Sequence, residues 1–269
     1  MSTTAATTST AARVATRERR VPPMGGFSLN LLFLEIRRVL RNRRTMIFIL
    51  IMPAVFFLLW GLPQRGQQFA NGSPVTAYIM ISLAVYGALV ATTSGGGMVA
   101  VERALGWSRQ LRLTPLRPAA YVATKVLTAM SLSLVAVLVE FVVGAVSGVR
   151  MAPHIWIEAG LAAWIGSLVF AAFGLFVGYL FPAENVTQFV GPILAILAMF
   201  GGLFVPLEVL PHVIQTIAKF TPVYGVGSIA RSPLTGSGFT ATAVANVLAW
   251  TAVFGFGAAR LFRRDTARV

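Results

Sequence analysis

Long apolar stretches alternate with short polar segments along most of the chain. About 20 apolar residues in a helix cross the roughly 30 Å hydrocarbon core of a bilayer, whereas strands of a membrane barrel are about 10 residues long and alternate in polarity. Backbone groups inside lipid must be hydrogen-bonded within their own segment, so these stretches predict helices. The expected spans are residues 45–62, 74–93, 121–149, 155–180, 186–205 and 240–261.

Two segments precede the first expected span. Residues 1–27 are rich in Ser, Thr, Ala and Arg and lack an apolar run, which is typical of a disordered tail. Residues 28–44 follow a helical period and predict an amphipathic helix on the membrane surface, with its arginines among anionic head groups. The alternative interpretation is a plain basic flank of the first span. The apolar face would contain Leu29, Leu32, Phe33, Ile36 and Leu40, and the basic side Arg37, Arg38 and Arg41.

The overall composition agrees with a membrane protein. The 269 residues are 57% hydrophobic and only 11% charged, with a mean hydropathy of +0.78, whereas soluble domains have about 25% charged residues. The absence of cysteine excludes a disulfide framework, a thiolate metal site and a cysteine nucleophile. The two histidines, His154 and His212, lack the spacing of metal ligands, so we expect no metal site.

The basic residues are unevenly distributed around the expected spans. The formal net charge is +14, and 18 of the 22 basic residues fall in the N-terminal segment, in the segment between the second and third spans with its exit, and in the C-terminal tail. Because basic residues concentrate on the cytoplasmic side of membrane proteins, both termini are expected to lie in the cytoplasm. The expected location is a cell (plasma or inner) membrane. The excess charge thus sets topology, and no nucleic-acid partner is expected. The four basic residues on the outer side are Arg65, Arg150, Lys219 and Arg231.

The expected fold class is therefore an all-α polytopic membrane protein with six transmembrane helices, an N-terminal amphipathic surface helix and both termini in the cytoplasm. Two segments between spans stand out. Residues 94–120 combine leucines, arginines and two prolines, and would form either a short helix that docks into a partner or a basic loop without one. Residues 206–239 carry four prolines and interrupted apolar positions, which predict a re-entrant or interfacial pair of short helices on the outer side.

Glu140 is the one carboxylate well inside an expected span. A charge within the membrane is costly and is by default a hypothesis for a functional site. It could line a substrate path or pair across a dimer. Alternatively, the third span is longer than the membrane requires, which would place Glu140 near the outer interface.

An ATP-binding P-loop is absent from the sequence. That motif needs Gly-Lys-Ser/Thr, in which the lysine reaches the phosphates. The two lysines, Lys125 and Lys219, stand in Thr-Lys-Val and Ala-Lys-Phe, and the glycine-rich stretch at 94–97 has no lysine. Close helix packing is the favoured interpretation of that stretch. If the chain supports ATP-driven transport, another chain must therefore supply the ATPase.

The segment after the second span contains a recognisable motif. Its pattern is Glu-Arg-x-x-Gly-x-x-x-x-Leu-x-x-Thr-Pro-Leu, formed by Glu102, Arg103, Gly106, Leu111, Thr114, Pro115 and Leu116. This motif resembles the type-2 permeases of ATP-binding-cassette exporters. The outer prolines at 206, 211 and 222 and the inner turn at 181–185 are also similar to that family, and the resemblance covers residues 28–262.

The resemblance implies a six-helix permease domain over residues 28–269. Such permeases dimerise, as a homodimer or a pair, and sit on two ATP-binding-cassette ATPase subunits, which use ATP and Mg while the permease binds no cofactor. The N-terminal surface helix touches the ATPase as well. A coupling element would then include Glu102, Arg103, Gly106, Arg109, Leu111, Thr114 and Pro115.

Function and cargo follow from the same resemblance. We hypothesise that Glu102 makes polar contacts at the ATPase surface and that the complex exports a drug-like, lipid or other amphipathic substrate. Two other classes remain open: a non-transporting membrane assembly or immunity factor and, more remotely, an intramembrane hydrolase, which needs a serine and a histidine that converge.

Overall fold

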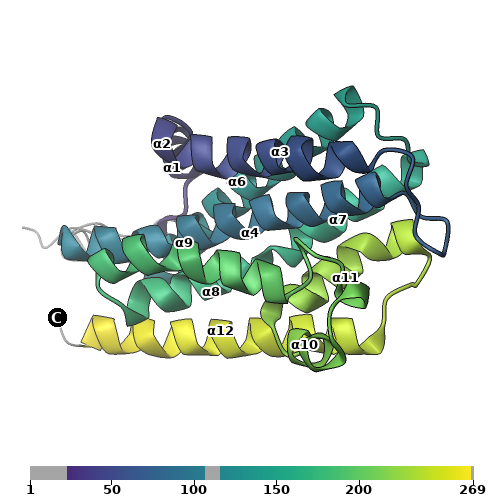
Figure 1. Ribbon diagram of the computed structural model, residues 1–269. Coiled ribbons are helices and arrows are strands. Elements are labelled where there is room, and N and C mark those ends of the chain that lie inside the picture. The colour runs from purple at the N-terminus through teal and green to yellow at the C-terminus, as the bar shows by residue number, and fades with distance from the viewer. Residues whose placement is uncertain (1–22, 107–115, 268–269) are drawn as a thin grey trace, which may run out of the picture.

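The computed structural model describes residues 23–106 and 116–267, which are helical with short connections (Figure 1). Six helical segments in these ranges are long and apolar enough to cross a membrane, so the predicted number of spans is confirmed. They are Ile47–Gln64, Val75–Ala104, Ala119–Val146, Pro153–Leu180, Ala183–Phe200 and Ala241–Asp265.

The individual helices divide some of these spans. A short turn η1 (Pro23–Gly26), the helix α1 (Leu29–Leu40) and the turn α2 (Arg43–Met46) precede the first span. The first span contains two π-helical turns, Ile47–Ile51 and Phe57–Gly61, on either side of α3 (Met52–Phe56). Pro53 in α3 lacks an N–H and crowds the preceding turn, which explains the departure from regular α-helical hydrogen bonding over Ile47–Ile51. The remaining long helices are α4 (Val75–Ala104), α6 (Pro118–Val146), α7 (Pro153–Gly166), α8 (Leu168–Leu180), α9 (Ala183–Phe200) and α12 (Ala241–Ala267).

The helix α4 is the centre of the bundle and is the most buried of the six spans. It packs against α6 on one side and against α8 on another. A β-carbon added at Gly95 would lie 2.8 Å from Ala129, and one at Gly144 would lie 2.1 Å from Met80. These contacts pair early α4 with late α6, so the two helices are antiparallel.

The contact between α4 and α8 depends on glycines. A β-carbon at Gly96 would approach the backbone N of Leu175 to 2.6 Å, and one at Gly174 would approach the carbonyl O of Thr93 to 2.5 Å. This close packing explains why α4 runs on to Ala104, whereas the sequence pattern ended the second span at residue 93. The first eleven residues of the expected loop 94–120 are therefore helical, and the 94–97 stretch serves helix packing.

The segment 206–239 contains the turn η5 (Leu207–Val209) and two short helices, α10 (His212–Ala218) and α11 (Pro222–Thr235). α11 packs against α7, α12 and α4. Arg231 of α11 is buried, and its Nη1 donates hydrogen bonds to Ser82 Oγ at 3.0 Å and to the Gly202 carbonyl at 3.1 Å. Its guanidinium also lies 4.7 Å from the ring centroid of Tyr78. The basic residue expected in an outer loop thus holds α11 against α4.

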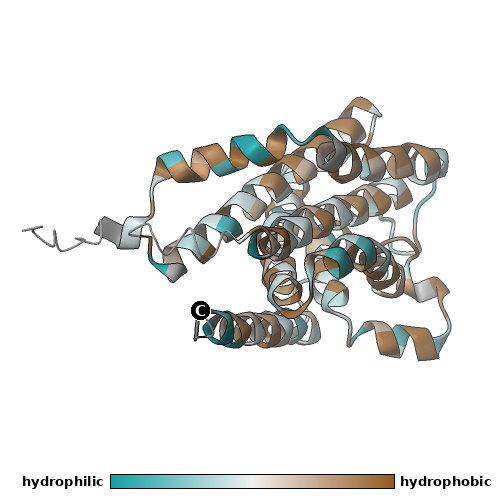
Figure 2. Cartoon of the chain, turned by 90° about the vertical axis from the view of Figure 1, so that its left-hand side faces the viewer, coloured by the Kyte–Doolittle hydropathy of each residue, from teal (hydrophilic) through white to brown (hydrophobic). Residues whose placement is uncertain are grey.

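The bundle has two ends with different composition. We call the C-terminal end the one at which α4, α8 and α12 end and α6 and α9 begin; α10 and α11 lie toward the opposite end (Figure 1). In Figure 2 hydrophobic colour predominates along the helices, while hydrophilic colour is strong near the marked C-terminus and on the helix that follows the grey N-terminal trace. The charged clusters of the next subsection all lie at the C-terminal end.

The α4–α8 contact gives a stability prediction. Gly96→Ala places a methyl group against backbone atoms that cannot move aside, so the free energy of unfolding should fall by about 1–3 kcal/mol. Gly255→Ala on α12 is the matched control, because a β-carbon there meets nothing within 4 Å; it should be neutral or stabilising by up to about 1 kcal/mol. Thermal unfolding of the purified proteins in detergent measures both, and equal effects would contradict this packing.

Candidate functional site

A buried cluster of charged side chains joins three helices at the C-terminal end. Glu102, near the end of α4, accepts hydrogen bonds from Arg38 Nη2 of α1 at 2.5 Å and from Lys125 Nζ of α6 at 2.6 Å, both on Oε1. Its other oxygen accepts a hydrogen bond from the Tyr121 hydroxyl at 2.5 Å. We call these residues, together with Glu35 of α1, the Glu102 cluster.

Charge balance explains how this cluster can be buried. Glu102 is 6% exposed and Lys125 4% exposed. Glu35 completes the group, because its Oε2 lies 3.0 Å from Lys125 Nζ and 3.2 Å from Arg38 Nη2. Two carboxylates and two cations therefore neutralise one another, and both oxygens of Glu102 are occupied. Buried charges are tolerated only under such conditions, and breaking a pair by removing one partner is strongly destabilising.

Arg38 is the most exposed member of the cluster, with 46% of its side chain accessible. Burial lowers the pKa of its guanidinium, but the hydrogen bond that it donates to Glu102 and the charges of Glu35 and Glu102 outweigh that effect and raise this pKa above the ordinary value. Arg38 therefore stays charged and holds α1 to α4. The other two basic residues predicted for the surface helix, Arg37 and Arg41, are exposed; Arg38 instead turns toward the bundle.

A second ion pair follows directly in the sequence. Arg103 binds Asp265 of α12 with two hydrogen bonds, from Nε to Oδ2 at 3.1 Å and from Nη2 to Oδ1 at 2.6 Å. Its Nη1 donates to the carbonyls of Gly178 and Tyr179 in α8, at 3.2 and 3.1 Å. This side chain therefore ties α4 to both α8 and α12, in the planar two-point geometry that arginine provides. We call it the Arg103 anchor.

The connection from α4 to α6 leaves and re-enters the bundle beside these two groups. Gly106 adopts a positive φ of 73° just after α4, a conformation that glycine provides at helix ends. At the other end, the Arg117 amide donates to the Gly25 carbonyl of η1 at 2.8 Å. Both ends of the connection are thus fixed. The predicted coupling residues Arg109, Leu111, Thr114 and Pro115 lie outside the described residues.

The structure brings together residues that the motif did not indicate. Glu102 and Arg103 were singled out from the sequence, but their partners Glu35, Tyr121, Lys125 and Asp265 were not. A signal was present, because three of the four are charged groups close to the edges of apolar runs. It could not be used, since the pairing depends on which helices are neighbours. Among the described residues, no cluster of three or more His, Asp or Glu side chains could hold a metal ion.

Glu140 lies apart from both groups, in the half of α6 that is distant from the C-terminal end of the bundle. It is 1% exposed, and neither carboxylate oxygen has a hydrogen-bond partner among the described residues. One turn further along α6, Gly144 faces Met80 of α4, so Glu140 lies on the helix face that packs against α4. It is enclosed between helices in this conformation and does not line an open path.

Comparison with known proteins agrees with this architecture. Residues 30–234 match the ABC-2 type transporter family. The chain is also 28% identical over 222 residues to "Putative transport permease YvfS" of Bacillus subtilis (strain 168), an alignment that covers 82% of this chain and 90% of that protein. The six membrane helices and these matches define a multi-pass transmembrane transporter subunit. The chain belongs to the ABC-2 type transporter family, which implies association with an ATP-binding-cassette subunit.

The Glu102 cluster predicts a measurable coupling between its members. Glu102→Gln and Lys125→Met should each lower the free energy of unfolding by about 2 kcal/mol or more, because each leaves a buried charge without its main partner. The double variant should lose less than the sum of the two, by about 1–3 kcal/mol, since Glu35 and Arg38 then remain as a balanced pair. Thermal unfolding in detergent of the wild type, the two single variants and the double variant measures this double-mutant cycle. Strict additivity of the two losses would contradict a direct interaction.

For Glu140 we expect the opposite effect, because replacing this residue should increase the free energy of unfolding. Glu140→Met removes a buried carboxyl group without a partner and keeps a side chain of similar shape, so the free energy of unfolding should rise by about 1–3 kcal/mol. Glu158→Met is the control, because Glu158 is exposed on α7 and should change little. Both are compared by thermal unfolding. A loss of stability in Glu140→Met would mean that the carboxylate has a partner in the working protein.

Proposed function

We propose that this chain is the membrane-spanning subunit of an exporter driven by separate ATP-binding subunits. It forms the substrate path as a dimer, either with itself or with a second permease. The partner subunits use ATP and Mg, and this chain binds no cofactor. The complex lies in the cell membrane with both termini in the cytoplasm, and α1 lies on the membrane surface.

The observation that carries this proposal is the fixed geometry at the two ends of the α4–α6 connection. The Arg103 anchor lies three residues before Gly106, and α6 begins at Pro118 with Tyr121 and Lys125 in its first two turns. A partner that pushes on this connection therefore acts directly on the buried pair of Glu102 and Lys125 and on the partly buried pair of Arg103 and Asp265. Such pairs cannot lengthen without leaving charges unpaired, which costs several kcal/mol, so the attached helices move together.

The proposed route of the movement divides into two branches. The Glu102 cluster passes it to α1 and α6, and the Arg103 anchor passes it to α8 and α12. Because α4 packs against both α6 and α8, a shift of its C-terminal end reaches both sides of the bundle. ATP-driven closure of the partner subunits would reshape the path in this way.

The role proposed for Glu102 changes in the light of its burial. Its carboxylate is enclosed by donors from this chain, so we assign it the positioning of the connection. Contact with the ATPase then belongs to the segment with Arg109, Leu111, Thr114 and Pro115, together with the exposed arginines of α1. Glu140 would reach a cargo only if α4 and α6 separate during the cycle.

An apolar or amphipathic cargo, such as a drug-like molecule or a lipid, fits the exposed surfaces. The first span and α9 have few buried residues, and Leu59, Trp60, Phe189 and Ile196 are among their exposed apolar side chains. These faces can be covered by a second permease, by cargo or by lipid. The segment Ile47–Gln64 contains no charged residue and α9 contains only Glu184, which disfavours a multiply charged cargo on these two faces.

The test uses the complex assembled with its ATP-binding subunit. Arg103→Gln together with Asp265→Asn removes the anchor without leaving either charge unpaired, so the complex should still assemble, while stimulation of ATP hydrolysis by the permease falls roughly fivefold or more. Arg150→Gln, an exposed site at the opposite end, is the control. ATPase assays and size-exclusion chromatography measure the two effects.

Two results would contradict this account. If the anchor variant stimulates ATP hydrolysis as strongly as the wild type does, the proposed route through α8 and α12 is wrong. Uptake into inverted vesicles that proceeds equally well without any ATP-binding subunit would overturn the proposed function itself.

A further inference from the structure

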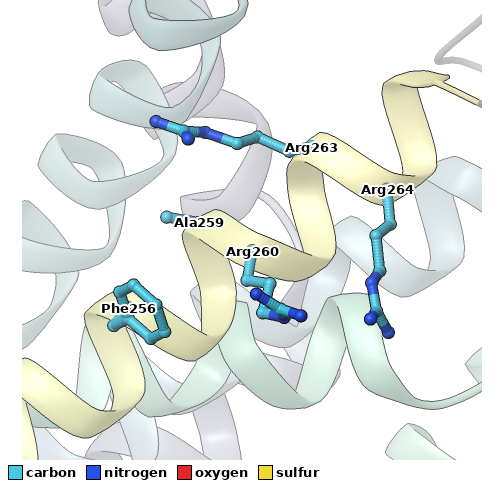
Figure 3. Close-up of a pocket in the computed structure, with 5 residues that line it drawn as sticks. All are labelled: Phe256, Ala259, Arg260, Arg263 and Arg264. Carbon is cyan, nitrogen blue, oxygen red and sulfur yellow. The ribbon is translucent and has the colours of Figure 1, made fainter.

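A basic hollow lies on the face of α12 that points away from the bundle, near the C-terminal end of this helix (Figure 3). Its volume is about 400 Å³, and it is separate from both the Glu102 cluster and the Arg103 anchor. Among the residues that line it are Phe256, Ala259, Arg260, Arg263 and Arg264. Figure 3 shows Arg260 and Arg264 extending to the same side of the helix, while Arg263 extends to another.

The helical period explains how this surface changes character along α12. Val253, Phe256, Arg260 and Arg264 lie three or four residues apart and so share one face. Val253 is 56% exposed and Phe256 70% exposed, and Arg260 and Arg264 are also exposed. The face is thus apolar at Val253 and Phe256 and cationic over the following two turns, at Arg260 and Arg264. The opposite face packs inward through Phe254 and Ala258, which are buried.

The positive charge of this face is not neutralised within the described residues. The nearest carboxylate in sequence, Asp265, uses both oxygens to bind Arg103 on the inward side. None of the ion pairs among the described side chains involves Arg260 or Arg264. Two adjacent guanidinium groups without a carboxylate repel each other, and an anion placed between them removes that repulsion.

We propose that this hollow is a binding site for an anionic phospholipid. The guanidinium groups of Arg260 and Arg264 bind the phosphate and the charged headgroup, and the acyl chain lies along Phe256 and Val253. Arginine suits this role because its planar donors match phosphate oxygens. Basic pockets beside transmembrane helices, at the level of the head groups, bind such lipids.

The position of the site favours a lipid over a soluble anion or a protein. Four residues of helix separate Phe256 from Arg260, a rise of about 6 Å, which is the distance over which a phospholipid changes from acyl chain to headgroup. α12 also has the smallest buried share of the six spans, 17%, so its outer face is open to the bilayer. A soluble anion would use the arginines but leave Phe256 without a partner.

The test is native mass spectrometry of the full chain in detergent, titrated with phosphatidylglycerol or with phosphatidylcholine. The wild-type protein should retain phosphatidylglycerol in preference to phosphatidylcholine. Arg260→Gln with Arg264→Gln should weaken phosphatidylglycerol binding roughly tenfold or more, as expected for two arginines at a membrane surface. Arg65→Gln with Arg150→Gln removes the same charge from exposed sites at the opposite end and should leave the preference intact.

The remaining arms separate the alternatives. Arg260→Lys with Arg264→Lys keeps the charge and should retain most of the binding. If the double glutamine variant does not fold, Arg260→Gln and Arg264→Gln are tested singly, and each should weaken phosphatidylglycerol binding. Equal retention of both lipids by the wild type, or equal binding by the glutamine variant, would overturn the proposal. So would displacement of the lipid by water-soluble glycerol phosphate at similar concentration, which indicates a soluble-anion site. If the glutamine variant differs from the wild type in its number of subunits but not in bound lipid, the hollow is a protein interface. That result would also overturn the proposal of a phospholipid site.

Discussion

The carboxylate of Glu102 is the constraint on which the C-terminal end of the bundle depends. It is buried between α1, α4 and α6, so it needs donors on both oxygens and cations beside it. Arg38, Tyr121 and Lys125 provide these from two other helices, and Glu35 restores the balance of charge. Any sequence change that keeps Glu102 must therefore keep α1, α4 and α6 in one arrangement. The Glu102 cluster therefore fixes the relative position of three helices, which apolar packing alone would specify only weakly.

Glycine and arginine divide the remaining work on α4. Glycines let α8 approach α4 until backbone atoms touch, which fixes the distance between the helices. The Arg103 anchor then fixes their register at one end, because its guanidinium bridges Asp265 and two carbonyls of α8. At the opposite end, buried Arg231 holds α11 against α4 through Ser82. The central helix is thus pinned at both ends by a guanidinium group, and the connection to α6 starts from a rigid base.

Hydropathy was sufficient to predict the six spans, because a bilayer imposes both length and polarity on a helix. It was insufficient for the end of α4 and for the division of the fourth span at Ser167, where α7 gives way to α8. Both features depend on tertiary contacts: the glycine contact with α8 in one case, and in the other the hydrogen bond between Ser167 and Ser133 of α6.

The candidate site was only partly accessible to sequence reasoning. The motif identified Glu102 and Arg103, but it could not indicate that the Glu102 carboxylate is buried among donors from its own chain. The contact of Glu102 with a partner protein stays a prediction. Charged residues such as Lys125 and Asp265 look like ordinary flanks of apolar runs until the helices are placed side by side. The predicted roles of Arg109, Leu111, Thr114 and Pro115 stay predictions, as does the position of α1 on the membrane surface.

In the mechanism proposed for this protein, the ATP-binding subunit docks on the α4–α6 connection, which the Glu102 cluster and the Arg103 anchor support. The chain has no cysteine, so a single cysteine can carry a photoactivated cross-linker without background. Leu111→Cys places it in the connection, and Ala70→Cys places it in the exposed segment before α4 at the opposite end. In the assembled complex, Leu111→Cys should cross-link to the ATP-binding subunit and Ala70→Cys should not. Cross-linking from Ala70→Cys alone would contradict both the orientation and the coupling proposed for this protein.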